Sequence, residues 1–351
     1  MEANKDNKRT DVNTLGEFGL IDHLTRNFAL NNVTSVKGVG DDAAVLQAGE
    51  EVVLISTDML VEGIHFDLAY TPLKHLGYKS IVVNVSDIYA MNGVPTQVTV
   101  SIAISNKYSV EALDEFYAGI LLACEKYNVD LIGGDTTSSP KGMTVSVTAI
   151  GRAKPEMVAY RSGAKVGDII CVSGYLGAAY LGLQILEREK QIYLENPDIQ
   201  PDLDNASYLI ESILKPEAAK DAIEYFHKHK LVPTSMIDVS DGLASELFHI
   251  AKQSGVGLFI EETKLPIHQE TQLKAISFNI DPLTCALHGG EDYELLFTVD
   301  PKDLEKVKYM PDVYIIGDIV DKADGLTLHT SGGNIKDLVA QGWQHFRKDE
   351  N

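Results

Sequence analysis

Five short segments of this chain place carboxylates beside glycines or small hydroxylated residues, and most follow an apolar run that is typical of a β-strand. They are residues 38–42 (GVGDD), 56–58 (STD), 133–137 (GGDTT), 238–242 (DVSDG) and 289–292 (GGED). We therefore expect the acidic side chains to project from strand ends. Such grouped oxygens suit Mg²⁺, which commonly bridges to phosphates, and the glycines let the backbone approach a phosphate closely. The pattern predicts an enzyme that moves phosphate with several metal ions.

The size and charge of the chain narrow the class of protein. Its 351 residues favour two domains, because a single hydrophobic core usually stops growing below that length. Apolar residues make up 44% and charged residues 23%, which is ordinary for a globular protein. The net charge of −21 repels nucleic acids and anionic membrane surfaces. We expect no nucleic-acid partner, and we expect ATP to enter an acidic pocket only together with a metal.

The cysteines and the N-terminus indicate the compartment. Cys124, Cys171 and Cys285 are far apart and form no C-x-x-C motif, so neither a zinc site nor a disulfide framework is indicated. Residues 1–14 are polar, lack the apolar core of a signal peptide and read as a disordered tail. No run reaches the roughly 18 apolar residues of a membrane span. We expect a cytoplasmic protein with no membrane partner.

The spacing of apolar residues predicts the main elements. Helices are expected near residues 20–28, 72–88 and 109–124, and strands near 52–55, 98–104, 129–132, 143–150 and 168–173. Pro72 suits a helix start and Ser109 a helix cap. For residues 50–150 we expect the order strand, helix, strand, strand, helix, strand, as in a split βαβ layer. The polar segment 187–205 is expected to be an exposed linker or hairpin.

Common nucleotide-binding motifs fit poorly. Residues 38–43 match G-x-G-x-x-A, but Asp41 and Asp42 would face the pyrophosphate of a dinucleotide with negative charge. The chain has no Gly-Lys pair for a Walker A loop and no protein-kinase His-Arg-Asp or Asp-Phe-Gly motif. Taken singly, an aspartate such as Asp135 or Asp241 is more often a turn or cap residue. Only the joint pattern favours a metal site.

Three further candidates have an ordinary structural explanation beside the functional one. A lone histidine such as His65 is more often a structural side chain than a catalyst. Arg161 follows a strand, where it could bind phosphate or simply lie on the surface. Trp343, the only tryptophan, is typical of a core or a lid, and an exposed face could stack on an aromatic ring.

Taken together, the motifs occur in an order that resembles the thiamine-monophosphate kinases. They lie at residues 39–44 (VGDDAA), 56–66 (STDMLVEGIHF), 84–87 (NVSD), 132–137 (IGGDTT), 161–164 (RSGA), 237–243 (IDVSDGL) and 289–295 (GGEDYEL). The resemblance implies the α+β fold of the aminoimidazole-ribonucleotide synthetase superfamily. It implies a ferredoxin-like (split-βαβ) ATP- and Mg²⁺-binding domain at residues 15–152 and an α/β domain at 153–346, followed by a tail at 347–351. Strands of the first domain would pair into a barrel across a homodimer.

The resemblance also implies an activity and its residues. ATP would donate its γ-phosphate to thiamine monophosphate, with several Mg²⁺ ions as cofactors. The implied magnesium shell is Asp42, Ser56, Thr57, Asp58, Asp87, Asp135, Asp238 and Asp241, of which Asp42, Asp58, Asp87 and Asp135 would be catalytic. The implied ATP contacts are Tyr117, Gly134, Asp135, Arg161 and Ser240. The implied contacts of thiamine monophosphate are His65, Glu291 and Trp343.

Because donor and acceptor are both anions, their repulsion has to be cancelled. Two unit charges ~4 Å apart repel by ~1 kcal/mol in water and by ~4 kcal/mol at an effective dielectric constant of 20. We expect direct in-line transfer, governed by positioning and charge neutralisation, without a phosphoenzyme. The alternatives are another synthetase of the superfamily that acts on a ribonucleotide amide, and a nucleotide-binding sensor without turnover. Selenophosphate synthetases use a reactive cysteine near the N-terminus, whereas the first cysteine here is Cys124.

Overall fold

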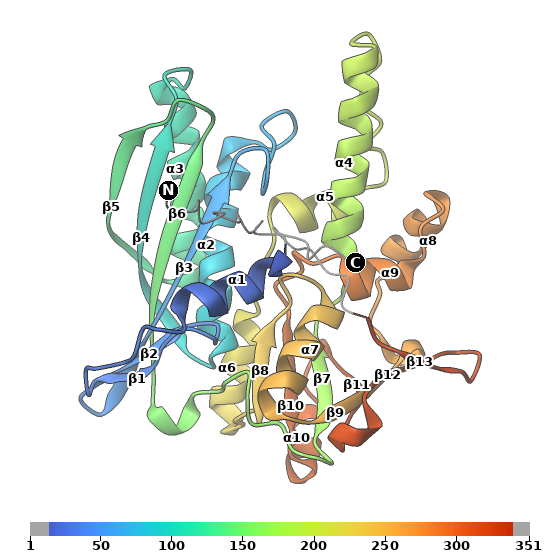
Figure 1. Cartoon of the computed structure of the whole chain (residues 1–351). Coiled ribbons are helices and arrows are strands. Elements are labelled where there is room, and N and C mark those ends of the chain that lie inside the picture. Colours follow the sequence, from blue (N-terminus) through green and yellow to red (C-terminus); the bar gives the residue numbers. More distant parts are fainter. Residues whose placement is uncertain (1–13, 340–351) are drawn as a thin grey trace, which may run out of the picture.

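The computed structural model of the chain describes residues 14–339. This range leaves out most of the expected N-terminal tail at 1–14, of which only Thr14 is described. It also leaves out the expected tail at 347–351 and Trp343. Two β-sheets with helices packed on them make up the described part (Figure 1). None of the helices in this part combines the length and apolar character that crossing a membrane requires.

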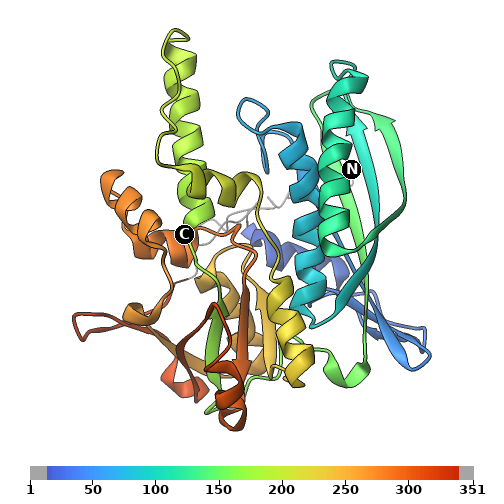
Figure 2. The same cartoon turned by 180° about the vertical axis from the view of Figure 1, so that it is seen from behind.

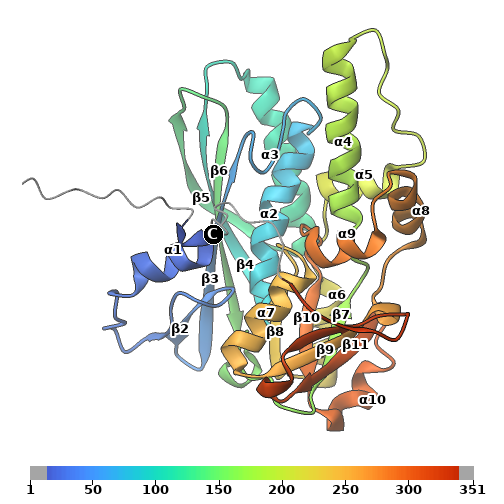
Figure 3. The ribbon, with the colours of Figure 1, turned by 45° about the vertical axis from the view of Figure 1, so that its right-hand side comes forward.

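The first sheet has six strands in the order β1-β2-β3-β6-β4-β5. They are β1 (Ser35–Lys37), β2 (Ala44–Ala48), β3 (Glu51–Val61), β4 (Val94–Ile104), β5 (Asp130–Ser138) and β6 (Thr144–Ala153). Helices α2 (Leu73–Ala90) and α3 (Val110–Tyr127) cover one face of it (Figure 3). The chain order from β3 on is strand, helix, strand, helix, strand, strand, so the expected order of strand, helix, strand, strand, helix, strand was wrong, although a helix or strand of the expected kind lies at each expected range. β4 and β5 are parallel, and parallel neighbours need a crossover such as α3 between them.

Both predicted starts of these helices are confirmed. Helix α2 begins directly after Pro72, and the Ser109 hydroxyl accepts a hydrogen bond from the Ala112 N–H at 3.2 Å, capping α3. The two helices pack closely because glycines face backbone. A Cβ atom on Gly77 would lie 1.9 Å from the Phe116 carbonyl oxygen. A Cβ atom on Gly119 would lie as close, 1.9 Å, to the Lys74 carbonyl oxygen.

Two strands run further than expected, which corrects the position of their acids. β3 continues to Val61, so Asp58 lies inside the strand, opposite Val147 of β6. Asp135 likewise lies inside β5, opposite Ser101 of β4. The strands continue because a paired neighbour satisfies their backbone groups beyond the apolar run. In contrast, Asp238 is the last residue of β8 (Ser235–Asp238), as predicted.

The second sheet has seven strands in the order β13-β12-β9-β11-β7-β10-β8, antiparallel except for the pair β9 and β12. Besides β8 they are β7 (Ile169–Ser173), β9 (Gly257–Glu261), β10 (Leu295–Val299), β11 (Val313–Val320), β12 (Leu326–His329) and β13 (Ile335–Asp337). The remaining helices are α1 (Gly16–Thr25), α4 (Ala178–Glu195), α5 (Ser207–Leu214), α6 (Lys220–His229), α7 (Leu243–Ser254), α8 (Gln269–Ser277), α9 (Pro282–His288) and α10 (Leu304–Val307).

The first predicted helix, α1, ends before Phe28. Phe28 is 82% exposed and Leu24 is 59% exposed, so its apolar residues are not a buried face in this chain. The strand predicted at residues 168–173 is confirmed by β7.

The segment at 187–205 was expected to be a linker or hairpin, but its first nine residues continue α4 to Glu195. This helix projects from the body of the molecule (Figure 2). Tyr70 donates a hydrogen bond to Glu187 at 2.7 Å, and Lys190 pairs with Asp67 at 2.7 Å. These contacts with the loop between β3 and α2 give the segment a packing partner that its polar composition did not indicate.

The two sheets share apolar core. One buried cluster contains Ile81 and Val85 of α2 together with Leu295 and Phe297 of β10. We retain as a proposal the domain boundary at residues 152–153, which falls at the end of β6 and well before the start of β7.

Candidate active site

Three carboxylates from distant parts of the chain meet where α2 passes between the sheets. One oxygen from each of Asp42, Asp87 and Asp238 lies within 4.8 Å of the others. Asp42 precedes β2, Asp87 is on α2 and Asp238 ends β8. Asp42 and Asp238 are buried, so three like charges are held close together largely out of water. Such a group is stable only when protons or a cation offset the charge.

Helix α2 and strand β3 supply the surroundings of this acid triad (Asp42, Asp87 and Asp238). Ser56 and Asp58 lie two residues apart and therefore on the same face of β3. The Ser56 hydroxyl donates a hydrogen bond to Asp87, and the Asp58 carboxyl group is near enough for its charge to act on Asp87. The Ser86 hydroxyl donates to Asp238 Oδ2 at 2.6 Å. Four of the predicted magnesium-shell aspartates are thus brought together with Ser56.

Burial raises the pKa values of this group. Desolvation, followed by the Asp42 charge, raises the pKa of Asp238 to about 7. Desolvation also raises the pKa of Asp87 well above its usual range, with Asp58 adding the next largest effect. The pKa of Asp42 is raised by burial although the Arg161 guanidinium opposes the shift. The carboxylates therefore reach full ionisation at neutral pH only with a cation beside them.

Arg161 brings a cation to one side of the triad. Its Nη2 donates to Asp42 Oδ1 at 2.7 Å, and its backbone N–H donates to Asp41 Oδ1 at 3.0 Å. Asp42 Oδ2 and Arg161 Nε are buried, and neither has a hydrogen-bond partner within residues 14–339. An unpartnered buried polar atom is costly, so each should be satisfied by a ligand. The carboxylate oxygen fits a divalent cation, and the guanidinium N–H fits a phosphate oxygen.

Two predicted magnesium-shell residues lie apart from the triad. The Thr57 side chain faces the opposite side of β3 from Asp58, and its hydroxyl donates to the Val147 carbonyl at 2.9 Å. Asp135 is exposed on the edge strand β5, where its Oδ1 accepts from the Thr136 N–H at 2.9 Å. Their roles as metal ligands stay predictions.

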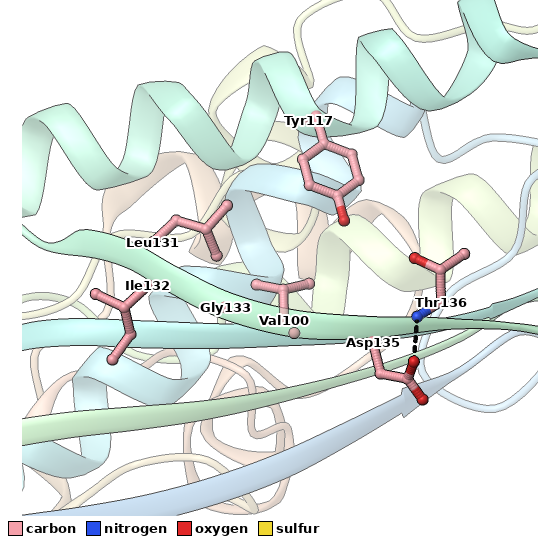
Figure 4. A pocket seen from close by; sticks show the side chains of 8 residues that line it. Val100, Tyr117, Leu131, Ile132, Gly133, Asp135 and Thr136 are labelled. Carbon is pink, nitrogen blue, oxygen red and sulfur yellow. Dashed lines mark hydrogen bonds between the residues drawn. The ribbon is translucent and has the colours of Figure 1, made fainter.

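Asp135 instead is one of the residues that line a pocket at the edge strand β5, with a cavity volume of about 530 Å³ (Figure 4). The predicted ATP contacts Tyr117, Gly134 and Asp135 gather here. Tyr117 and Thr136 lie on one side of β5 and Asp135 lies on the other (Figure 4). A Cβ atom on Gly134 would lie 1.8 Å from the Val100 carbonyl oxygen, so only glycine fits that position.

The loop at residues 289–293 packs against the end of β8. The Glu291 N–H donates to the Ser240 carbonyl at 2.7 Å, and the Tyr293 N–H donates to the Val239 carbonyl at 2.9 Å. The predicted ATP contact Ser240 and the predicted acceptor contact Glu291 are therefore neighbours. Asp241, next to Ser240, has a pKa raised to about 7, first by burial and then by the Glu17 charge.

His65 lies in the turn after β3, where its Nδ1 accepts a hydrogen bond from the Val61 N–H at 3.0 Å. The third predicted acceptor contact, Trp343, lies outside the described residues.

Three polar residues of α2 were not predicted as site residues. Asn84 accepts from the Asp58 N–H at 3.1 Å, Ser86 bonds Asp238, and Lys79 donates to Glu291. All three are buried in a helix whose other residues from Leu76 to Ala90 are mostly apolar. One signal in the sequence could have identified them as site residues: they are polar residues within an otherwise apolar stretch of a predicted helix. Burying a polar side chain there without a partner would be costly.

Comparisons with known proteins agree with this geometry. The family described as AIR synthase related protein, N-terminal domain, matches residues 40–153, from the loop that carries Asp42 to the end of β6. The fold and this match thus define an AIR synthase-related protein.

Relatives that match nearly the whole chain identify the family within this class more closely. The thiamine-monophosphate kinase of Aquifex aeolicus is 35% identical over 332 residues, covering 95% of this chain and 98% of its own length. That of Bacillus subtilis is 33% identical over 340 residues, covering 95% and 100%. A solved structure of AaThiL complexed with AMPPCP and TMP is similar with a TM-score of 0.81 and 32% identity, covering 97% of this chain and 100% of that one. The chain belongs to the thiamine-monophosphate kinase family.

Proposed function

We propose that the protein transfers the γ-phosphate of ATP to thiamine monophosphate, forming thiamine diphosphate and ADP. The observation that carries this proposal is the acid triad beside Arg161, in a chain that belongs to a family named for this reaction. The AaThiL complex with AMPPCP and TMP supports the choice of the two substrates.

In this proposal Asp42, Asp87 and Asp238 hold Mg²⁺, with Ser56 and Asp58 beside them. Bound Mg²⁺ would neutralise phosphate charge where donor and acceptor approach each other. The free Nε–H of Arg161 is available to a phosphate oxygen. The acceptor is a phosphate oxygen that is already nucleophilic, so direct in-line transfer needs no strong general base. The chain then contributes positioning and electrostatic stabilisation.

The other residues predicted for the site would bind the two substrates, ATP at one end and thiamine monophosphate at the other. Gly134, Asp135 and Tyr117 would bind ATP at their pocket, together with Arg161 and Ser240. Thr57, Asp135 and Asp241 would complete the set of metal ligands in the working enzyme. His65 and Glu291 would contact thiamine monophosphate, as would Trp343.

We also propose that the protein acts as a homodimer in the cytoplasm. The edge strand β5 is exposed along its whole length, with Ile132 57% exposed. The face of β3 that points away from α2 carries Val53, Ile55 and Met59, and Met59 is 56% exposed. An unpaired edge and an exposed apolar face on the same sheet favour pairing with a second copy. Three buried, unpaired cysteines suit a reducing compartment.

One assay separates this function from its alternatives. The purified protein is incubated with Mg²⁺ and ATP, with and without thiamine monophosphate, and ADP and thiamine diphosphate are measured. ADP release that requires thiamine monophosphate, with equal formation of thiamine diphosphate, is the expected result. Release that instead requires a ribonucleotide amide would indicate a synthetase, and binding of ATP without any release would indicate a sensor.

A further inference from the structure

Lys79 is the only lysine or arginine among the buried residues of the described chain, at 3% exposure. Taking an ammonium group out of water is expensive unless it is paired and hydrogen-bonded. A lysine at this position of α2 therefore needs a specific partner, and its partner is a residue of the candidate site.

The ammonium group joins three separate segments. Lys79 Nζ donates to Glu291 in the 289–293 loop and to the Ile213 carbonyl oxygen of α5 at 3.2 Å. The Lys79 side chain is 4% exposed and that of Glu291 is 27% exposed. The pair is therefore asymmetric: the Lys79 ammonium group is buried, and the Glu291 carboxylate is partly exposed to solvent.

The backbone of Glu291 is also held. Its φ of +62° lies in the left-handed region, which is strained for a non-glycine residue. Its N–H donates to the Ser240 carbonyl at 2.7 Å, and a Cβ on the preceding Gly290 would lie 2.4 Å from that same oxygen. Backbone and side chain are both fixed, as is typical of a residue held for binding.

Helix α2 connects this pair to the acid triad. Lys79 and Asp87 are eight residues apart on the helix, which corresponds to ~12 Å along its axis. One buried helix thus carries a triad carboxylate near one end and the cation that holds Glu291 about two turns earlier. Helix α2 is rigid and therefore fixes the distance between the metal site and Glu291.

We propose that Lys79 is a positioning residue for the acceptor: it binds Oε2 of Glu291 and so orients the other carboxylate oxygen toward thiamine monophosphate. This inference rests on the proposed function, because it assumes that Glu291 contacts the acceptor. Lys79 itself is too deeply buried to touch either substrate.

The test compares Lys79→Met, Lys79→Arg, Glu291→Gln and the double variant Lys79→Met/Glu291→Gln with the wild type. Lys302→Met is the control, since its side chain is 73% exposed and, within residues 14–339, forms its one ion pair with Asp300. Calorimetry measures the Kd of thiamine monophosphate without ATP, steady-state kinetics measures both KM values, and thermal unfolding measures the Tm. We expect Lys79→Met to weaken thiamine monophosphate about ten-fold or more, as removal of a residue that orients a ligand group does. The KM for ATP should stay within about two-fold, and Lys79→Arg should recover part of the affinity.

The double variant leaves no unpaired buried charge and protects the test against misfolding of the single variant. We expect it to bind thiamine monophosphate as weakly as Glu291→Gln alone, because both changes remove one interaction. Additive losses, unchanged affinity in a folded Lys79→Met variant, or equal losses for both substrates would each overturn the proposal. A wild type that binds no thiamine monophosphate would instead refute the proposed function.

Discussion

The Ser86 hydroxyl on α2 donates to Asp238 Oδ2 at the end of β8 at 2.6 Å, joining two residues 152 positions apart. This bond links a helix packed on the first sheet to a strand of the second sheet at the acid triad. The site therefore exists only when the two sheets are packed together, and loosening that packing should disrupt the cation site before it unfolds either sheet.

Removing one triad carboxylate should abolish most turnover while the fold survives. We expect Asp238→Asn to lower kcat/KM by at least about 100-fold, because a charge-neutralising ligand is lost. The metal-free variant should also unfold at a higher temperature than the metal-free wild type at pH 8, because one buried like charge is gone. Kinetics over a Mg²⁺ titration and thermal unfolding in chelator check both expectations. Near wild-type turnover at saturating Mg²⁺ would reject the proposed metal role.

The stability of the metal-free protein should fall as pH rises from about 6.5 to 8. The pKa values of Asp238 and Asp241 are raised to about 7 in the folded state, so the folded protein holds protons that the unfolded chain has released. The stabilisation from these bound protons is fully present below about pH 4, near the pKa of an aspartate in the unfolded chain. It is lost as the pH rises through about 7, the pKa in the folded state. The expected loss in this window is on the order of 1 kcal/mol. Burial lowers the pKa of His249 to about 4, so its opposing effect continues up to the pKa of about 6.5 in the unfolded chain and fades within the lower part of the window.

Mg²⁺ should reverse that trend. Because a cation competes with protons for the triad, it should raise the Tm more at pH 8 than at pH 6.5. Thermal unfolding at both pH values, in chelator and in Mg²⁺, measures the difference. Stabilisation that does not depend on pH would show that Mg²⁺ binds away from these carboxylates.

Two adjacent glycines of β5 should respond differently to alanine. In Gly134→Ala the new Cβ would collide with the Val100 backbone, whereas a Cβ on Gly133 has nothing within 4 Å. We expect Gly134→Ala to lower the Tm and weaken ATP binding, with Gly133→Ala as the near-neutral matched control. Thermal unfolding and calorimetric titration of ATP provide the measurements. Equal effects of the two substitutions would argue against the close packing of β5 on β4.

The proposed dimer predicts that charge on the open edge of the first sheet favours the monomer. Ile132→Lys places an ammonium group on β5, where Ile132 is 57% exposed. Leu273→Lys, at a position 62% exposed on α8, is the matched control. Size-exclusion chromatography with light scattering should show a wild-type dimer, a shift to monomer for Ile132→Lys, and no shift for the control. A monomeric wild type would rule the dimer out.

Local features of the fold were predictable because short windows of sequence encode them. Pro72 and Ser109 mark the starts of α2 and α3, and Asp238 ends a strand, each through a local rule of capping or apolar spacing. Where long-range pairing extends an element, prediction failed. Neighbouring strands carried β3 and β5 past the expected positions of Asp58 and Asp135, and packing on Tyr70 and Asp67 accompanies the continuation of α4.

The sequence by itself determined which residues could carry chemistry here, since the order of the acidic motifs pointed to the family and to Asp42, Asp87 and Asp238. Only the tertiary structure decided that these three meet, that Asp135 lies apart on β5, and that Lys79 holds Glu291, 212 positions away. The reason is physical. Capping and periodicity act over a few residues, whereas the partner of a buried charge is chosen by which elements pack around it.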